Sequence, residues 1–79
     1  MVDYWMEELT LVEAAAMRIQ AREDLAERLF FEARARAQAA GDEQAVLKSE
    51  EFATWMAARN DTDAAWGRWS QVMDARPPA

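Results

Sequence analysis

The residues of this 79-residue chain that could carry acid–base or metal chemistry are almost all carboxylates. The chain contains neither cysteine nor histidine, so it lacks the commonest general base and the commonest transition-metal ligands. Two pairs of glutamates are adjacent in sequence, Glu7–Glu8 and Glu50–Glu51. Neighbours on a helix point about 100° apart, so neither pair can share a site. We therefore expect no catalytic site, no metal and no cofactor, and a protein that is not an enzyme.

The second distinctive group of residues is aromatic. Trp55, Trp66 and Trp69 fall within fifteen residues at helical spacing. Tryptophan is large and rigid, and it serves either as core filling or as an anchor in protein interfaces. We expect these three to pack with Phe52 in a small core, and they are also candidates for contact with a partner protein.

The charge of the chain is the third feature, with fifteen acidic and nine basic residues and a formal net charge of −6. An acidic surface repels phosphates, so direct binding of nucleic acid is not expected. One reading of the acidic residues is plain solubility. The other is mimicry of a phosphate backbone, which requires carboxylates along one stripe. The candidates are Glu7, Glu8, Glu13, Glu50, Glu51, Asp61 and Asp63.

The composition predicts an all-α fold, because good helix formers dominate and glycine occurs only at 41 and 67. Asp3 is a suitable N-cap, and Gly41 suits the position just after a helix. We predict a single domain over 1–79, with helices over 4–40, 43–59 and 62–75 and a turn at 60–62. The predicted fold is a three-helix bundle, or a four-helix bundle if the long first helix breaks near 20–24.

An apolar stripe runs along the first predicted helix in steps of three and four, like the seam of a coiled coil. Its positions are Trp5, Leu9, Val12, Ala16, Ile19, Glu23, Ala26, Phe30, Ala33, Ala37 and Ala40. A continuous helix over 4–40 would be about 55 Å long, whereas a compact chain of this size has a radius of gyration near 12 Å. The helix is therefore expected either to break near 20–24 or to pair with a second copy. We predict a homodimer formed through the first helix.

The N-terminus opens with acidic residues, and no stretch approaches the roughly 20 apolar residues that span a membrane. We expect a cytoplasmic protein without membrane contact.

The segment 41–73 resembles the cytoplasmic N-terminal domain of FecR-type regulators of sigma factors. The resemblance is carried by Gly41, by Phe52 eleven residues later, by Trp55, and by Ala65-Trp66 eleven residues after that tryptophan. The proline that the family has in its second turn falls at Asn60. The resemblance implies a small helical bundle that binds an alternative sigma factor.

The small size, acidity and lack of cysteine are also similar in general character to phage-encoded inhibitors such as anti-CRISPR proteins. The function we predict is a regulator that binds and controls another protein, in the manner of an anti-sigma factor. One alternative is an inhibitor that blocks the channel of a nucleic-acid-binding complex with its acidic surface. The other is a structural dimerisation module.

Overall fold

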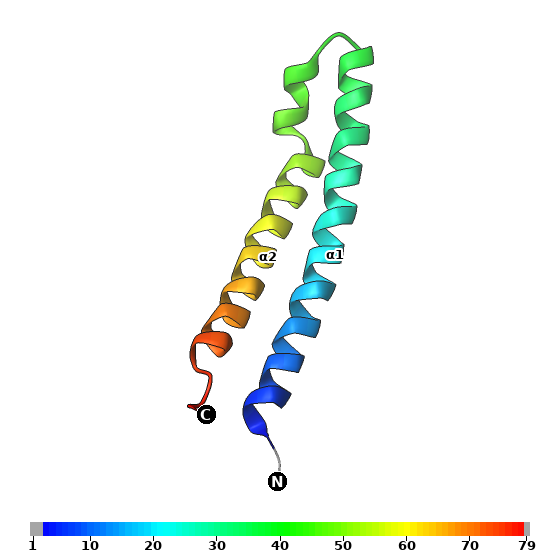
Figure 1. Ribbon diagram of the computed structural model, residues 1–79. Coiled ribbons are helices and arrows are strands. Elements are labelled where there is room, and N and C mark those ends of the chain that lie inside the picture. The colour runs from blue at the N-terminus through cyan, green and yellow to red at the C-terminus, as the bar shows by residue number, and fades with distance from the viewer. Residues whose placement is uncertain (1–2, 79) are drawn as a thin grey trace.

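The chain folds as a long hairpin of two helices. The computed structural model describes residues 3–78, in which helix α1 runs over Tyr4–Ala39, a 3₁₀ helix η1 over Glu43–Lys48 and helix α2 over Glu50–Asp74. In Figure 1, α2 returns antiparallel beside α1, so that both ends of the chain lie at the same end of the molecule. We call this the free end, and the opposite end the loop end. The hairpin measures 62 × 15 × 15 Å.

The first helix begins at the predicted residue, Tyr4, and ends at Ala39, one residue before the predicted end. An Asp3 carboxylate oxygen accepts a hydrogen bond from the Met6 N–H at 3.2 Å, which caps the first turn. At the other end, Gly41 has φ +77°, a left-handed conformation that glycine adopts without strain. The Gly41 and Asp42 N–H groups donate to the Gln38 and Ala37 carbonyls, in the pattern of a Schellman motif.

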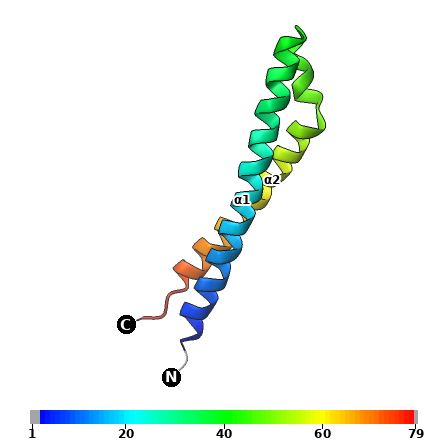
Figure 2. The same ribbon diagram turned by 90° about the vertical axis from the view of Figure 1, so that its right-hand side faces the viewer.

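Helix α1 is continuous, so of the two expected alternatives the break near 20–24 does not occur. The seam prediction is confirmed, because nearly every seam residue from Trp5 to Ala37 is buried or half-buried. The seam faces α2 and η1 of the same chain along its whole length. The helix therefore needs neither a break nor a second copy to cover that stripe. Figure 2 shows the two helices crossing at a small angle, as expected where the apolar repeat is seven residues.

Helix α2 differs from the two helices predicted for this region. The segment 43–48 is 3₁₀, and α2 begins after Ser49, whose hydroxyl accepts a hydrogen bond from the Phe52 N–H at 3.1 Å. The predicted turn at 60–62 is wrong. Thr62 is buried in the middle of α2 and donates its hydroxyl proton to the Ala58 carbonyl at 3.0 Å.

The reason for the uninterrupted helix lies in the spacing of the inward residues. The residues of α2 that face α1 step by three and four straight through the polar segment; they are Trp55, Ala58, Thr62, Ala65 and Trp69. Because neither glycine nor proline interrupts residues 60–62, the apolar seam outweighs the weak helix propensity of Asn60 and Asp61. The all-helical prediction is confirmed. The three-helix bundle is not, because the third predicted helix is the second half of α2.

The core of the hairpin is thin. Within the described part of the chain, six apolar residues are buried, and of these only Phe30 and Val46 are larger than alanine. Phe30, Ala33 and Val46 form a cluster at the loop end, against which Phe52 and Trp55 pack. Among residues 3–78, no helix is long and apolar enough to cross a membrane.

Candidate protein-binding surfaces

Trp55 belongs to the core cluster of the loop end. Its ring stacks on Phe30 with centroids 4.8 Å apart and an interplanar angle of 29°, and Phe31 lies 5.9 Å away. The Arg59 guanidinium sits 5.9 Å from the centre of the same ring, a cation–π contact. Trp55 is nevertheless only half-buried. It therefore fills the core with one face and keeps part of its surface for solvent.

Trp66 and Trp69 form a separate pair nearer the free end. Their rings meet edge to face, with centroids 5.7 Å apart and an interplanar angle of 76°. The Trp66 indole N–H donates to the Gln20 side-chain oxygen at 2.9 Å, which ties α2 to α1. We expected the tryptophans to pack together. Trp66 and Trp69 do so, and Trp55 packs with Phe52. Because α2 is continuous, Trp55 and Trp66 are about 16 Å apart along one helix, so a single core of all four residues is wrong.

Trp5 joins the two ends of the chain. Its indole N–H donates to the Val72 carbonyl at 2.6 Å. Val72 lies in the last turn of α2, and its carbonyl also accepts a hydrogen bond from the Ala75 N–H at 3.2 Å. The Arg76 guanidinium covers the Trp5 ring at 5.6 Å. Trp5 therefore acts as a cap on α2 as well as a seam residue.

Two indole N–H groups are buried without a hydrogen-bond partner in the described part of the chain, those of Trp55 and Trp69. A buried donor left unpaired costs about 1–3 kcal/mol. Both rings lie in the seam of α2, so they are held there by packing rather than by polar contacts.

The candidate carboxylates divide between two opposite sides and both ends of the hairpin. Glu7 and Glu8 lie in the first turns of α1, at the free end. Glu51 instead makes a 3.9 Å ion pair with Arg36 of α1. Arg36 lies 29 residues, or about 43 Å, beyond Glu7 along that helix. The seven residues therefore do not share one stripe.

Two shallow hollows on one side of the hairpin join into a groove between α1 and α2. They share Ala26 and Thr54, and both are open to solvent. The remaining lining residues are Ile19, Arg22 and Leu29 from α1 and Glu50, Glu51, Ala57, Ala58 and Asp61 from α2. Three candidate carboxylates, Glu50, Glu51 and Asp61, thus border the same groove. Leu11 and Leu25 lie on this side of α1 at heptad spacing, and we call it the leucine side.

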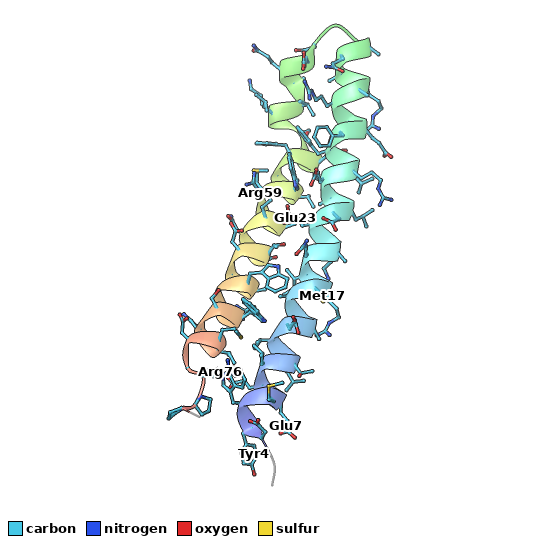
Figure 3. All side chains as sticks on the ribbon, in the orientation of Figure 1. Tyr4, Glu7, Met17, Glu23, Arg59 and Arg76 are labelled. Carbon is cyan, nitrogen blue, oxygen red and sulfur yellow. The ribbon has the colours of Figure 1, made fainter. Side chains whose placement is uncertain are left out.

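The opposite side of the hairpin carries exposed Met17 and Phe31, and we call it the aromatic side. A hollow here is lined by Glu13, Met17, Gln20, Ala21, Asp24 and Trp66. Phe31 follows Met17 by two heptads and contacts Trp55. Asp63 lies on the same side of α2 as Trp66, three residues away. Figure 3 shows Met17 on α1 and Arg59 on α2, with Glu23 between the two helices.

Glu23 is the charged residue in the seam of α1. It is half-buried and forms no ion pair among residues 3–78. The helix continues through it, so it acts as an interruption of the apolar contact rather than as a break of the backbone.

Arg34, Gln38 and Glu43 form a polar cluster between α1 and η1. The Arg34 Nε and Nη2 atoms donate to one Glu43 carboxylate oxygen at 3.1 and 3.0 Å, and the Gln38 amide donates to it at 3.1 Å. Hydrogen bonds from Arg34 and then Gln38 lower the pKa of Glu43 below its usual value of 4.5. The cluster is exposed, so it orients η1 rather than forming a reactive site.

Several exposed apolar residues do not belong to the predicted site. They are Tyr4, Met6, Leu11, Met17, Leu25 and Leu47. The sequence does hold a signal for four exposed residues. Leu11 and Leu25 stand two heptads apart on one side of the seam, and Met17 and Phe31 stand two heptads apart on the other.

No family model, curated protein or solved structure matches this chain. In residues 3–78, no group of three or more acidic side chains could hold a metal ion.

Proposed function

We propose that this chain is a small non-enzymatic regulatory protein that binds another protein through its aromatic side and controls it by covering a surface. The observation that carries the proposal is the exposure of Met17 and Phe31. These residues are 63% and 46% exposed, two heptads apart, beside the half-buried Trp55 and Trp66.

The chemistry of this side suits a protein partner with an apolar helical stripe. Aromatic residues are favoured anchors of interfaces, and methionine adapts its shape to different partners. The hydrogen bond to Gln20 holds the Trp66 ring in place before binding, which reduces the entropy lost on association. A partner helix laid along Met17 and Phe31 would contact anchors at heptad spacing, in the manner of a helix in a groove.

The polar groups at the edge of the aromatic side favour specificity over affinity. Glu13 and Asp24 border the hollow beside Trp66, and Arg34 borders a second hollow beside Phe30 and Leu47. A partner with basic residues facing Glu13 and Asp24 would associate faster at low salt.

Two more specific predictions from the sequence, a sigma factor as partner and the blocking of a nucleic-acid channel, each lack a feature that they require. A sigma factor as partner rests on the resemblance of residues 41–73, and the unbroken α2 lacks the turn that the resemblance implies. Blocking of a nucleic-acid channel needs one acidic stripe, whereas Glu13 and Asp61 lie on opposite sides. We therefore propose that the target is a protein surface with an apolar stripe.

The test is site-specific photo-cross-linking in the cells that naturally produce the chain. A benzophenone amino acid replaces Phe31 on the aromatic side or, as the control, Ala35, which is exposed on the same helix. We expect one heavier adduct with a second protein from position 31 and none from position 35.

The adduct is then tested for function with the purified partner. Phe31→Glu is expected to remove both the adduct at a neighbouring probe in place of Met17 and the effect on the partner's activity. Adducts of equal intensity from positions 31 and 35, or none beyond the chain itself, would contradict the proposal.

A further inference from the structure

The leucine side is left apolar and without cover in the single chain. Leu11, Leu25 and Leu29 are 70%, 51% and 45% exposed. Leu11 and Leu25 are two heptads apart, and Leu29 lies one turn after Leu25, so the three share one side of α1. The polar bonds that cross from α1 to Trp66 and to η1 lie on the aromatic side. An ion pair of 3.9 Å between Arg36 and Glu51 is the only one that borders the groove in the described residues.

The two helices present complementary surfaces on this side. Helix α1 offers leucine side chains, together with the guanidinium groups of Arg18, Arg22 and Arg36 against two carboxylates, Glu8 and Glu32. Helix α2 offers exposed Ala57 and Ala64, which lie seven residues apart and let another helix approach closely.

The charge of α2 on this side is opposite to that of α1. Glu50, Glu51 and Asp61 border the groove, against the single cation of Arg68. A leucine and arginine surface therefore faces the same way as an alanine and carboxylate surface.

We propose that two copies of the chain pack through their leucine sides as an antiparallel four-helix bundle, with a two-fold axis parallel to the helices. Such an axis places α1 of each copy on α2 of the other and leaves both loop ends at the same end. It preserves height along the axis, so each residue of α1 meets residues of the second copy that are level with it in its own chain.

The levels follow from the groove. Arg22 and Asp61 line one hollow, and Leu29 and Thr54 line the next. Leu25 lies between Arg22 and Leu29, as Ala57 lies between Thr54 and Asp61. In the dimer, Leu25 of one copy therefore packs on Ala57 of the second copy, and Arg22 of one copy faces Asp61 of the second.

The accessible surface is large enough for this association. The chain exposes 6068 Å², whereas a compact monomer of 9.0 kDa exposes about 4,850 Å². The excess of about 1,200 Å² exceeds the roughly 800 Å² that each partner buries in a standard interface. The aromatic sides would remain outside, one on each face of the dimer, and available to a partner.

The first test is the molar mass of the purified chain at tens of micromolar, measured by light scattering. We expect twice 9.0 kDa. Leu25→Glu should raise the dimer dissociation constant at least about tenfold, because two unpaired carboxylates would be buried. Met17→Glu, a matched change at an exposed position of the aromatic side, should leave the dimer intact.

The second test fixes the arrangement and does not depend on a destabilised variant. The natural chain has no cysteine, so Thr54→Cys and Asp61→Cys can be oxidised one at a time. With the axis along the groove, each position lies near its own copy, and both variants should form a disulfide-linked dimer. Met17→Cys should not.

The outcomes are distinct from those of the partner experiment. A mass of 9.0 kDa at 100 μM, or dissociation by Met17→Glu but not by Leu25→Glu, would overturn the proposal. A cross-link at only one of positions 54 and 61 would overturn the parallel axis, because an axis across the helices can bring only one height together. A monomer that still forms the adduct through position 31 would sink the dimer and leave the proposed function standing.

Discussion

The loop end and the free end of the hairpin are held together by different means. At the loop end, Phe30 and Val46 are buried among Ala33, Phe52 and Trp55. At the free end, the buried residues are small or polar: Ala16, Thr62 and Ala65. The two helices are joined there by the hydrogen bond of Trp5 to Val72 and by half-buried side chains. Apolar burial therefore stabilises the loop end, whereas a hydrogen bond and half-buried side chains stabilise the free end.

The largest expected effect is that of removing the centre of the loop-end cluster. Phe30→Ala should cost about 3–5 kcal/mol, because it deletes a buried ring and leaves a cavity against Trp55. The free energy of unfolding of a chain of this length is roughly 4–12 kcal/mol in total, so the variant should be largely unfolded at 37 °C. Thermal and urea unfolding followed by circular dichroism measure it.

The matched variant at the free end is Leu9→Ala, in a half-buried seam position. We expect a loss of about 1–2 kcal/mol, since part of that side chain stays in water in the folded chain. Equal losses for Phe30→Ala and Leu9→Ala would contradict the difference between the two ends.

The second prediction addresses the bond that holds the free end. Trp5→Phe should cost about 1–2 kcal/mol, because the Val72 carbonyl loses the indole donor and keeps only the Ala75 N–H, and the ring loses contact area. Hydrogen exchange of the amides in the last two turns of α2 should accelerate, while the amides around Ala33 keep their protection. Trp66→Phe, which removes the more exposed bond to Gln20, is the control and should cost less. If both substitutions lowered the free energy of unfolding equally, the hydrogen bond of Trp5 would contribute no more than the exposed bond of Trp66.

The third prediction uses the two glycines, one at each end. Gly41 has φ +77°, so Gly41→Ala should destabilise the loop end by about 1 kcal/mol through backbone strain alone, since no atom lies within 4 Å of the added Cβ. Gly67 sits within α2 with equally open space. Gly67→Ala should therefore stabilise the chain by about 0.5–1 kcal/mol. Changes of the same sign in urea unfolding would show that backbone conformation does not distinguish the two positions.

Local signals in the sequence predict a large part of this fold. The Asp3 cap, the Gly41 terminus and the heptad stripe of α1 could each be read directly, because each depends on residues within one helix. The turn predicted at 60–62 is wrong because contacts between the two helices decide the structure there. Asn60 and Asp61 favour turns locally, but the packing of Trp55, Ala58 and Thr62 on α1 overrides that preference.

The candidate surfaces were less predictable than the helices. Whether Glu13 and Asp61 face the same way depends on the rotation of two helices about each other, which no local pattern supplies. The aromatic residues were identified correctly as packing residues, but their division into a loop-end cluster and a Trp66–Trp69 pair follows from the continuity of α2.

The smallest expected effect concerns the polar cluster that attaches η1 to α1 at the loop end. Hydrogen bonds from Arg34 and Gln38 lower the pKa of Glu43. A carboxyl group with a lowered pKa in the folded chain contributes stability above its unfolded pKa, and this contribution is lost as the pH falls through the folded pKa. The carboxyl carbon of Glu43, followed by NMR, should therefore titrate below pH 4.5, its usual value. In Arg34→Gln the midpoint should move up toward that value, because the first donor and its positive charge are gone.

The same cluster allows the contributions of charge and of apolar burial to be separated at the loop end. Because Glu43 is exposed, salt should weaken its attraction to Arg34, whereas the apolar contact of Phe30 with Trp55 should not respond in that way. The difference in stability between the natural chain and Glu43→Gln should therefore shrink both below pH 4.5 and in 1 M salt. The Phe30→Ala difference should persist under both conditions. If high salt reduced the two differences alike, the loop end would owe its stability to charge rather than to burial.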